Sequence, residues 1–183
     1  MRPPGGRRRA RLGYIAVVMA QDPSDDVVTV VVEIPTGSRN KYEMDHDTGR
    51  IVLDRMLFTA TRYPADYGFI DGTMGRDGDP LDALVFVSEP TFPGCVIMAR
   101  PVGLFRMEDE KGPDDKILCV PLRDPHWSHI EKLEDLSPHV RAEVEHFFAV
   151  YKELEGKQVA TLGFGTREEA LQVIADARRR ASG

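Results

Sequence analysis

The stretch DGDPLDALVFV, Asp77 to Val87, places three aspartates directly before an apolar segment. The aspartates are Asp77, Asp79 and Asp82, and the residues from Ala83 onward are small, branched or aromatic. Branched and aromatic residues favour strands, and a short, wholly apolar run is typical of a strand buried on both faces. The stretch therefore predicts a core strand that begins at an acidic turn.

Apolar segments on either side of this stretch predict further strands. A cluster of turn-forming residues between two of them, DHDTG, predicts a hairpin. The predicted strands cover residues 27–33, the hairpin segments 41–45 and 50–57, a short strand near 67–70, the opening stretch, a long strand over 95–109 with a kink at Pro101–Gly103, and residues 116–122.

Two helices are predicted after these strands. Ser137 followed by Pro138 is a typical N-cap and first helical residue, and Gly156 is expected to end that helix. Thr166 and Glu169 form a capping-box pattern before a second helix that reaches Arg180. Strands followed by helices predict an α+β fold, and strongly bent strands indicate a closed or partly closed barrel.

The charge of the chain is unevenly distributed. The 183 residues carry a net charge of −6, although residues 1–20 contain five arginines and no acidic residue. The rest of the chain is therefore more acidic than the total suggests. Nucleic-acid binding needs a broad positive surface, so this distribution argues against a nucleic-acid partner and fits the binding of metal cations.

The N-terminal segment differs in composition from the rest. Residues 1–20 are basic and then apolar, as in a signal peptide, but the apolar part spans only about seven residues. We expect residues 1–20 to be a disordered extension, or to precede a true translation start at Met19, and residues 21–183 to form one domain. Cys95 and Cys119 lie in apolar runs and are expected to be buried free thiols, and no apolar run is long enough to predict a membrane span.

Acidic residues recur at the ends of the predicted strands. Besides the opening aspartates, they form the clusters Glu108–Glu110 and Asp114–Asp115, and Glu33 stands at the end of another strand. Any one such cluster could be a solvated loop, but crowded carboxylates raise one another's pKa unless cations neutralise them. Carboxylate oxygens suit Mg²⁺, Mn²⁺ or Ca²⁺, although the spacing does not match an EF-hand.

Cationic and phenolic residues accompany these acids: Lys41, Arg55, Lys116, Lys152, Tyr63, Tyr67 and Tyr151. Each taken singly is most simply a surface charge or a core ring. Together with carboxylate-bound Mg²⁺, however, they match what phosphoryl chemistry needs, because cations neutralise the phosphate oxygens. No P-loop or GxGxxG motif is present, and the five histidines show no metal-binding spacing; each is expected to be a surface or helix residue.

Several blocks in the same order resemble the soluble family I inorganic pyrophosphatases of bacteria. The most specific is DGDPLDA (77–83), and the others are VVVEIP, NKYEMD, VLDR, YPADYGFI, RPVGLFRMEDE, DDK and FFAVYKELEG, which together span about residues 28–156. The resemblance implies an OB-like five-stranded β-barrel with flanking helices. It also implies Mg²⁺-dependent hydrolysis of pyrophosphate to two orthophosphates by a cytoplasmic homohexamer.

The resemblance also implies a role for each matching residue. Asp79 is expected to be the general base that accepts a proton from the attacking water, with Tyr67 near it. Several Mg²⁺ ions per site are expected to be bound by Asp77, Asp82, Asp109, Asp114 and Glu33. Substrate binding is assigned to Lys41, Glu43, Arg55, Tyr63, Lys116, Tyr151 and Lys152. Mn²⁺ or Zn²⁺ are expected substitutes for Mg²⁺, and Ca²⁺ an inhibitor.

Two alternatives and one departure remain open. An OB-type module for single-stranded nucleic acid would need exposed aromatic side chains in a basic groove. A structural calcium-binding domain would use the same carboxylates without hydrolysis. Glu108 adds a carboxylate beside Asp109 where the family need not be acidic, so it either faces outward or tunes metal affinity.

Overall fold

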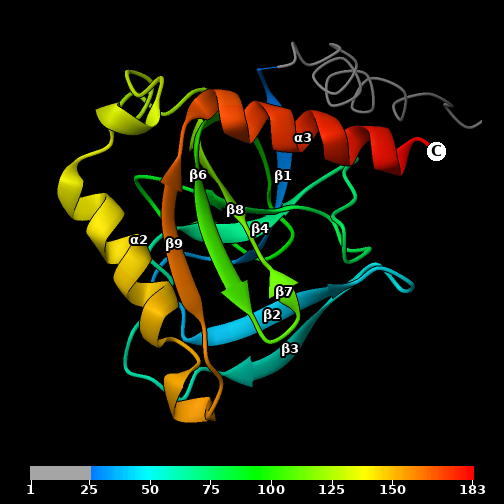
Figure 1. The fold of residues 1–183 in the computed structure, drawn as a ribbon, viewed down its shortest axis with the longest axis vertical. Helices are drawn as coiled ribbons and strands as arrows, with labels where there is room; N and C mark the ends of the chain where they lie inside the picture. The colour runs from blue at the N-terminus through cyan, green and yellow to red at the C-terminus, as the bar shows by residue number, and fades with distance from the viewer. Residues whose placement is uncertain (1–25) are drawn as a thin grey trace, which may run out of the picture.

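The computed structural model describes residues 26–183 (Figure 1). The expectation for residues 1–20 lies outside this range. Within it the strands are β1 (Val28–Ile34), β2 (Asn40–Asp45), β3 (Arg50–Met56), β4 (Asp66–Ile70), β5 (Asp82–Val85), β6 (Val96–Asp109), β7 (Gly112–Pro113), β8 (Lys116–Pro121) and β9 (Ala160–Gly165). The helices are α2 (Pro138–Val150) and α3 (Arg167–Ala181), with single 3₁₀ turns η1 (Leu133–Asp135) and η2 (Glu153–Glu155). The α+β prediction is confirmed.

Five strands pair in succession and return to the first. β1 pairs with β4, β4 with β5, β5 with β8, β8 with β6, and β6 again with β1. The β5–β8 ladder is parallel and the other four are antiparallel. Hairpin β2–β3 forms a separate two-stranded sheet. In Figure 1 the hairpin lies at the opposite end of the molecule from α3, and α2 runs along one side.

The strand predictions hold in most places. The hairpin is present, and the β6–β8 register shifts between Pro101 and Gly103, where the kink was predicted. Two strands were missed, the two-residue β7 and β9. β9 lies between the two helices and pairs with β6, so the strands do not all precede the helices. Its sequence, ATLGFG, is short and contains two glycines, which weaken a strand signal.

The first helix is shorter than predicted. Ser137 caps α2 by accepting the Val140 N–H at 3.2 Å, but α2 ends at Val150 rather than at Gly156. The 3₁₀ turn η2 follows, and Gly156, with φ of +73°, ends that turn instead. Glycine adopts this left-handed conformation without steric cost. Gly156 therefore does end an element, as predicted, but that element is η2 and not the helix.

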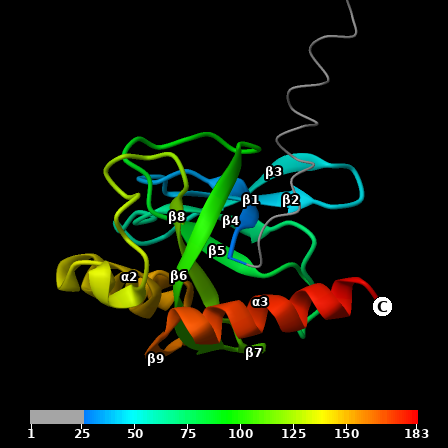
Figure 2. The ribbon, with the colours of Figure 1, turned by 90° about the horizontal axis from the view of Figure 1, so that it is seen from above.

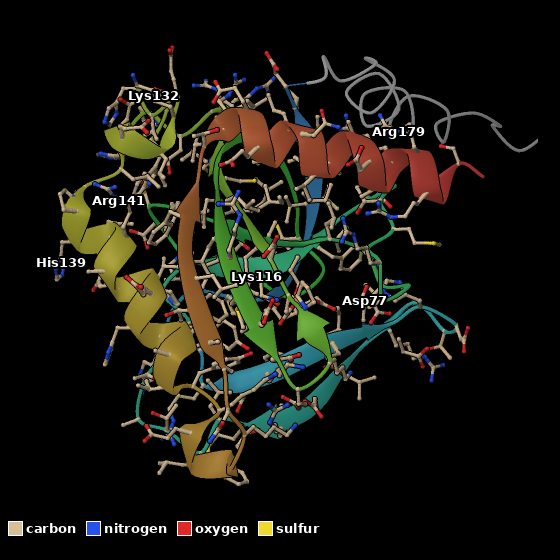
Figure 3. All side chains as sticks on the ribbon, viewed as in Figure 1. Asp77, Lys116, Lys132, His139, Arg141 and Arg179 are labelled. Carbon is tan, nitrogen blue, oxygen red and sulfur yellow. The ribbon has the colours of Figure 1, made fainter. Side chains whose placement is uncertain are left out.

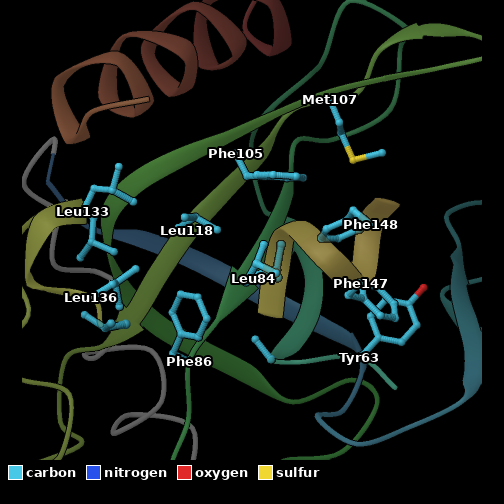
Figure 4. Packing of buried hydrophobic residues seen from close by; sticks show 14 of the residues in the cluster. Tyr63, Leu84, Phe86, Phe105, Met107, Leu118, Leu133, Leu136, Phe147 and Phe148 are labelled. Carbon is cyan, nitrogen blue, oxygen red and sulfur yellow. The ribbon is translucent and has the colours of Figure 1, made fainter. Parts of the chain in front are cut away.

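Alternate side chains of the core strands face two different hydrophobic clusters, as the two-residue period of a strand requires. Leu84 and Leu118 face a cluster that includes Phe105, Phe147 and Phe148, where α2 packs on the strands (Figure 4). Ring contacts tie this cluster together; the Phe105 and Phe148 centroids, for example, are 5.5 Å apart. Both faces of β5 and β8 are therefore covered, as the apolar opening stretch predicted.

The second cluster contains the intervening residues of the same strands. Ala83 and Ile117 pack there with Ala170 and Ile174 of α3, which crosses the strands as Figure 2 shows. Cys119 is fully buried here as a free thiol, whereas Cys95 is only partly buried. The predicted capping box of α3 is present, with the Thr166 N–H donating to Glu169 at 2.7 Å. No helix within residues 26–183 has the length and apolar character needed to cross a membrane.

The parallel pairing of β5 with β8 decides where the charges meet. Ala83 lies opposite Ile117 in this ladder, so the preceding residues Asp82 and Lys116 start adjacent strands at the same end. The opposite end of this ladder is apolar. The acidic turn before β5 therefore opens beside the β7–β8 connection that carries Asp114.

Candidate active site

A cavity of about 440 Å³ lies between the hairpin, the strand ends and the end of α2. Thirteen of the fourteen predicted site residues line it: Glu33, Lys41, Glu43, Arg55, Tyr63, Tyr67, Asp77, Asp79, Asp82, Asp109, Asp114, Tyr151 and Lys152. They come from segments up to a hundred or more positions apart. The exception is Lys116, which is buried directly behind the wall.

The loop before β5 is held by hydrogen bonds within itself. Asp77 Oδ1 accepts the N–H of Asp79 at 3.2 Å, and the Asp79 carbonyl accepts the N–H of Gly75 at 2.6 Å. Gly78 between the two aspartates has φ of +95°, a conformation that favours glycine. The loop thereby keeps Asp77 and Asp79 exposed at the cavity while β5 anchors it from behind.

Lys116 is the most buried charge of the site. Its side chain, labelled in Figure 3, is only 2% exposed. Its ammonium group contacts Asp82 Oδ2 at 2.5 Å and also Asp114. Burial alone would lower the pKa of Lys116, but the two carboxylates raise it, so the side chain stays charged. Burial in turn raises the pKa of Asp114, while Lys116 opposes the change.

The end of α2 supplies a second buried ion pair. The Lys152 ammonium lies 2.9 Å from Asp109 Oδ2, and both side chains are largely buried. Burial acts to raise the pKa of Asp109, but the hydrogen bonds from Lys152 and the Lys111 N–H, together with the charges of Lys152 and Lys116, outweigh it and the pKa is lowered. The segment directly after α2 thus holds β6 through charge where β6 reaches the cavity. Tyr151 and Lys152 were expected within a helix that ends at Gly156, but they follow the last residue of α2, Val150.

The hairpin contributes cations from β2 and β3. Lys41 pairs with Glu43 and lies 3.5 Å from Asp54, which also pairs with Arg55. Arg55 additionally binds Glu155, which lies a hundred positions later in the chain. The hairpin therefore lines the cavity with the cations of Lys41 and Arg55 and the carboxylate of Glu43.

Glu33 connects the hairpin to β1. Its Oε1 accepts the backbone N–H of Met44 at 2.6 Å. Burial raises the pKa of Glu33 from its ordinary value of 4.5 to about 7, and the hydrogen bond from Met44 only partly opposes this. Glu33 is thus the site carboxylate with the strongest tendency to hold a proton near neutral pH.

Three phenols close the inner wall of the cavity. Burial raises the pKa values of Tyr63 and Tyr67 well above the ordinary value for tyrosine, and burial also raises the pKa of Tyr151. The phenols therefore remain protonated and able to donate hydrogen bonds. The ring centroids of Tyr63 and Tyr67 lie 5.4 Å apart, and the Lys116 ammonium lies 5.8 Å from the Tyr67 ring centroid.

The comparisons with known proteins agree with one another. A model of the family described as inorganic pyrophosphatase matches residues 30–182. The chain belongs to the inorganic pyrophosphatase family. An inorganic pyrophosphatase of Streptomyces coelicolor is 59% identical over 142 residues, which cover 77% of this chain and 87% of that protein. One from Corynebacterium efficiens is 54% identical over 154 residues, covering 84% and 97%.

Solved structures of the inorganic pyrophosphatase family have the same fold. The crystal structure of inorganic pyrophosphatase from Thermus thermophilus superimposes with a TM-score of 0.86 at 45% identity, covering 88% of this chain and 95% of that one. The family resemblance carried by the DGDPLDA stretch is thereby confirmed.

The donor chemistry of the cavity suits the hard metal ions that sequence analysis expected. Eight carboxylates line it against five lysine or arginine side chains, and all five predicted metal ligands supply carboxylate oxygens. Within residues 26–183 no three acidic, histidine or cysteine side chains converge on one point at ligand distance. The reason is local: the ammonium groups of Lys116 and Lys152 lie against Asp82, Asp114 and Asp109. The carboxylates of Asp82, Asp114 and Asp109 are thus already paired with positive charge. A metal cation carries charge of the same sign, so these carboxylates also fit a metal ion.

Some residues in or beside the pyrophosphatase site were not singled out from sequence. His46 is exposed at the surface, as expected, but it also lines the cavity, with its ring centroid 5.1 Å from that of Phe69. Asp54 and Glu155 were not singled out; Asp54 lies next to Arg55 in the LDR block, but nothing in the sequence marks Glu155. Glu108 is exposed and does not line the cavity, because alternation along β6 turns it away from the face of Asp109.

Proposed function

We propose that this chain catalyses the Mg²⁺-dependent hydrolysis of inorganic pyrophosphate to two orthophosphates. The observation that carries the proposal is the convergence of the predicted carboxylates, cations and phenols around one cavity in a chain of the pyrophosphatase family. A metal-binding acidic wall facing Lys and Arg side chains is what a highly charged phosphate substrate requires.

The acidic wall is proposed to provide the metal ligands and the base. Asp77, Asp82, Asp109, Asp114 and Glu33 would hold Mg²⁺, which when bound lowers the pKa of a coordinated water and neutralises phosphate charge. Asp79 accepts a proton from the attacking water on its carboxylate. The hydrogen bond from the Asp79 N–H to Asp77 keeps this carboxylate beside the proposed ligands.

The cations and phenols are proposed to hold the substrate. Lys41, Arg55 and Lys152 bind the phosphate oxygens and stabilise the leaving phosphate as the bridging P–O bond breaks. The raised pKa values of Tyr63, Tyr67 and Tyr151 keep their hydroxyl groups available as donors. Lys116 acts from behind the wall, where it fixes Asp82 and Asp114. Glu43 orients Lys41 through their ion pair.

A phosphate-release assay tests this proposal. With Mg²⁺ we expect the protein to hydrolyse pyrophosphate and to leave a nucleoside triphosphate largely intact. Asp79→Ala, which removes the proposed general base, should lower kcat by at least about 100-fold. Asp82→Ala, which removes a proposed metal ligand, should lower kcat by at least about 100-fold as well. Glu108→Gln, outside the cavity, is the matched control and should keep wild-type activity. Hydrolysis that persists in EDTA, or full activity in both aspartate variants, would contradict the assigned roles.

The finer features are proposed on the same family basis. The cyclic pairing of β1, β4, β5, β8 and β6 supports an OB-like five-stranded barrel. A cytoplasmic homohexamer follows from the resemblance alone. Mass photometry of the purified protein would test the assembly.

A further inference from the structure

The guanidinium of Arg55 is held on two edges by carboxylates. Its Nε donates to Glu155 Oε1 at 3.0 Å, and its Nη2 lies 2.9 Å from Glu155 Oε2, so the pair is bidentate. Its Nη1 donates to Asp54. An arginine has five N–H donors, so these bonds leave two donors, one on each terminal nitrogen, for another acceptor. Arg55 lines the cavity, and these donors are the ones that can reach a phosphate there.

Glu155 is itself fixed by the turn that follows α2. Its backbone N–H donates to the Lys152 carbonyl at 3.0 Å, and Gly156 closes the turn by donating to the Glu153 carbonyl at 3.0 Å. The Glu155 side chain is only 7% exposed, against 25% for Arg55. Lys152, which binds Asp109, starts the same turn. One short segment therefore positions both Lys152, a cation that lines the cavity, and Glu155, which binds Arg55.

The hairpin needs such a tie because no ladder joins it to the larger sheet in the described part of the chain. The contact of Glu33 with the Met44 N–H holds β2 near β1. The Arg55–Glu155 pair holds β3 to the turn after α2, on the other side of the cavity. Loss of this pair would leave the guanidinium held by Asp54 alone, a residue of the same strand, and no longer tied to the turn after α2.

We propose that Glu155 is a positioning residue that fixes the fork of Arg55 for binding a substrate phosphate. This proposal rests on the proposed pyrophosphate hydrolysis. When Glu155 holds Nε and Nη2, the planar guanidinium of Arg55 presents its remaining N–H donors in one orientation. Less side-chain conformational entropy is then lost when the phosphate binds. Glu155 acts only through Arg55 and does not line the cavity.

Steady-state kinetics of Glu155→Gln test the proposal. Glutamine keeps the shape but loses the second acceptor oxygen and the charge, so kcat/KM should fall about 10- to 100-fold, mostly through a higher KM. Glu155→Asp keeps the charge but is one methylene shorter, and should show an intermediate loss. Glu153→Gln, an exposed change in the same turn, should behave as wild type.

A double-mutant cycle with Arg55→Ala separates positioning from a structural role. If Glu155 acts through Arg55, adding Glu155→Gln to Arg55→Ala should change kcat/KM by less than about twofold. An equal loss in both backgrounds, or a lower Tm with unchanged KM, would overturn the proposal. Wild-type kinetics in Glu155→Gln would overturn it as well. Failure of the wild-type protein to hydrolyse pyrophosphate would instead reject the proposed function.

Discussion

At the scale of single residues, the site consists of carboxylates that share a small number of buried cations. Lys116 bridges Asp82 and Asp114, and Lys152 binds Asp109. Each lysine offsets the repulsion that these crowded carboxylates would otherwise suffer. Glu33 has no such lysine in direct ion-pair contact within the described residues, and burial raises its pKa to about 7.

The pKa of Glu33 predicts how the stability of the metal-free protein depends on pH. The folded-state pKa of about 7 lies above the ordinary 4.5, so the folded protein holds this proton more tightly than the unfolded chain. The associated stability is fully present below about pH 4.5 and is lost as pH rises through about 7. In EDTA, urea unfolding should show a larger decrease from pH 5 to pH 8 in wild type than in Glu33→Gln.

The difference between the two proteins should amount to roughly 2 to 3 kcal/mol across that range. Glu108→Gln is the matched control, since Glu108 is exposed, and it should retain the wild-type pH dependence. Parallel curves for wild type and Glu33→Gln would show that Glu33 does not hold the proton.

At the scale of elements, the site depends on how closely β1 and β4 approach. β1 carries Glu33, β4 carries Tyr67, and the next residue, Gly68, pairs with Val32. A Cβ on Gly68 would lie 1.9 Å from the Val31 carbonyl oxygen, and backbone atoms cannot move aside as a flexible side chain can. Only glycine allows this ladder to close.

Gly68→Ala is therefore expected to lower the free energy of unfolding by roughly 3 kcal/mol, at the upper end of overpacking costs. Urea denaturation followed by circular dichroism would measure it. The comparison variant is Gly49→Ala in the hairpin turn, where the Cβ meets nothing within 4 Å but φ is +65°. That change should cost only about 1 kcal/mol, from backbone strain. Equal costs at the two positions would contradict the close approach.

At the scale of the whole molecule, the cavity lies where several independently anchored parts meet. The strand ends are fixed by the two hydrophobic clusters, the turn after α2 is fixed by its helix, and the hairpin is tied on by side chains. The five proposed metal ligands come from β1, the loop before β5, β5 itself, β6 and the β7–β8 connection. Metal binding should therefore stabilise the entire fold rather than one loop.

Mg²⁺ at about 100 times its Kd should stabilise the protein by about 2.7 kcal/mol per site, raising Tm by several degrees. Differential scanning fluorimetry with Mg²⁺ or EDTA measures the shift. Asp77→Asn should reduce it, whereas Glu108→Gln should not. Ca²⁺ should raise Tm through the same oxygens but support no phosphate release, because its looser coordination activates water less well. Hydrolysis with Ca²⁺ at the Mg²⁺ rate would contradict this expectation.

The sequence by itself determined the elements and most of the chemistry. The apolar run after Asp82 predicted a buried strand, the turn cluster DHDTG predicted the hairpin, and Thr166 predicted the start of α3; each is present. These signals are local, since propensity, capping and periodicity depend on neighbouring residues. The DGDPLDA stretch also led to the correct family, which the comparisons confirm.

Only the tertiary structure decided which charges meet. Asp82 and Lys116 are neighbours because β5 and β8 pair in parallel, and Glu155 reaches Arg55 across a hundred positions. His46 joins the cavity and Glu108 turns away from it for the same reason, the direction in which a strand or turn aims each side chain. Which strands pair, and where each side chain points, depend on packing between distant segments. A pattern of neighbouring residues does not contain this information.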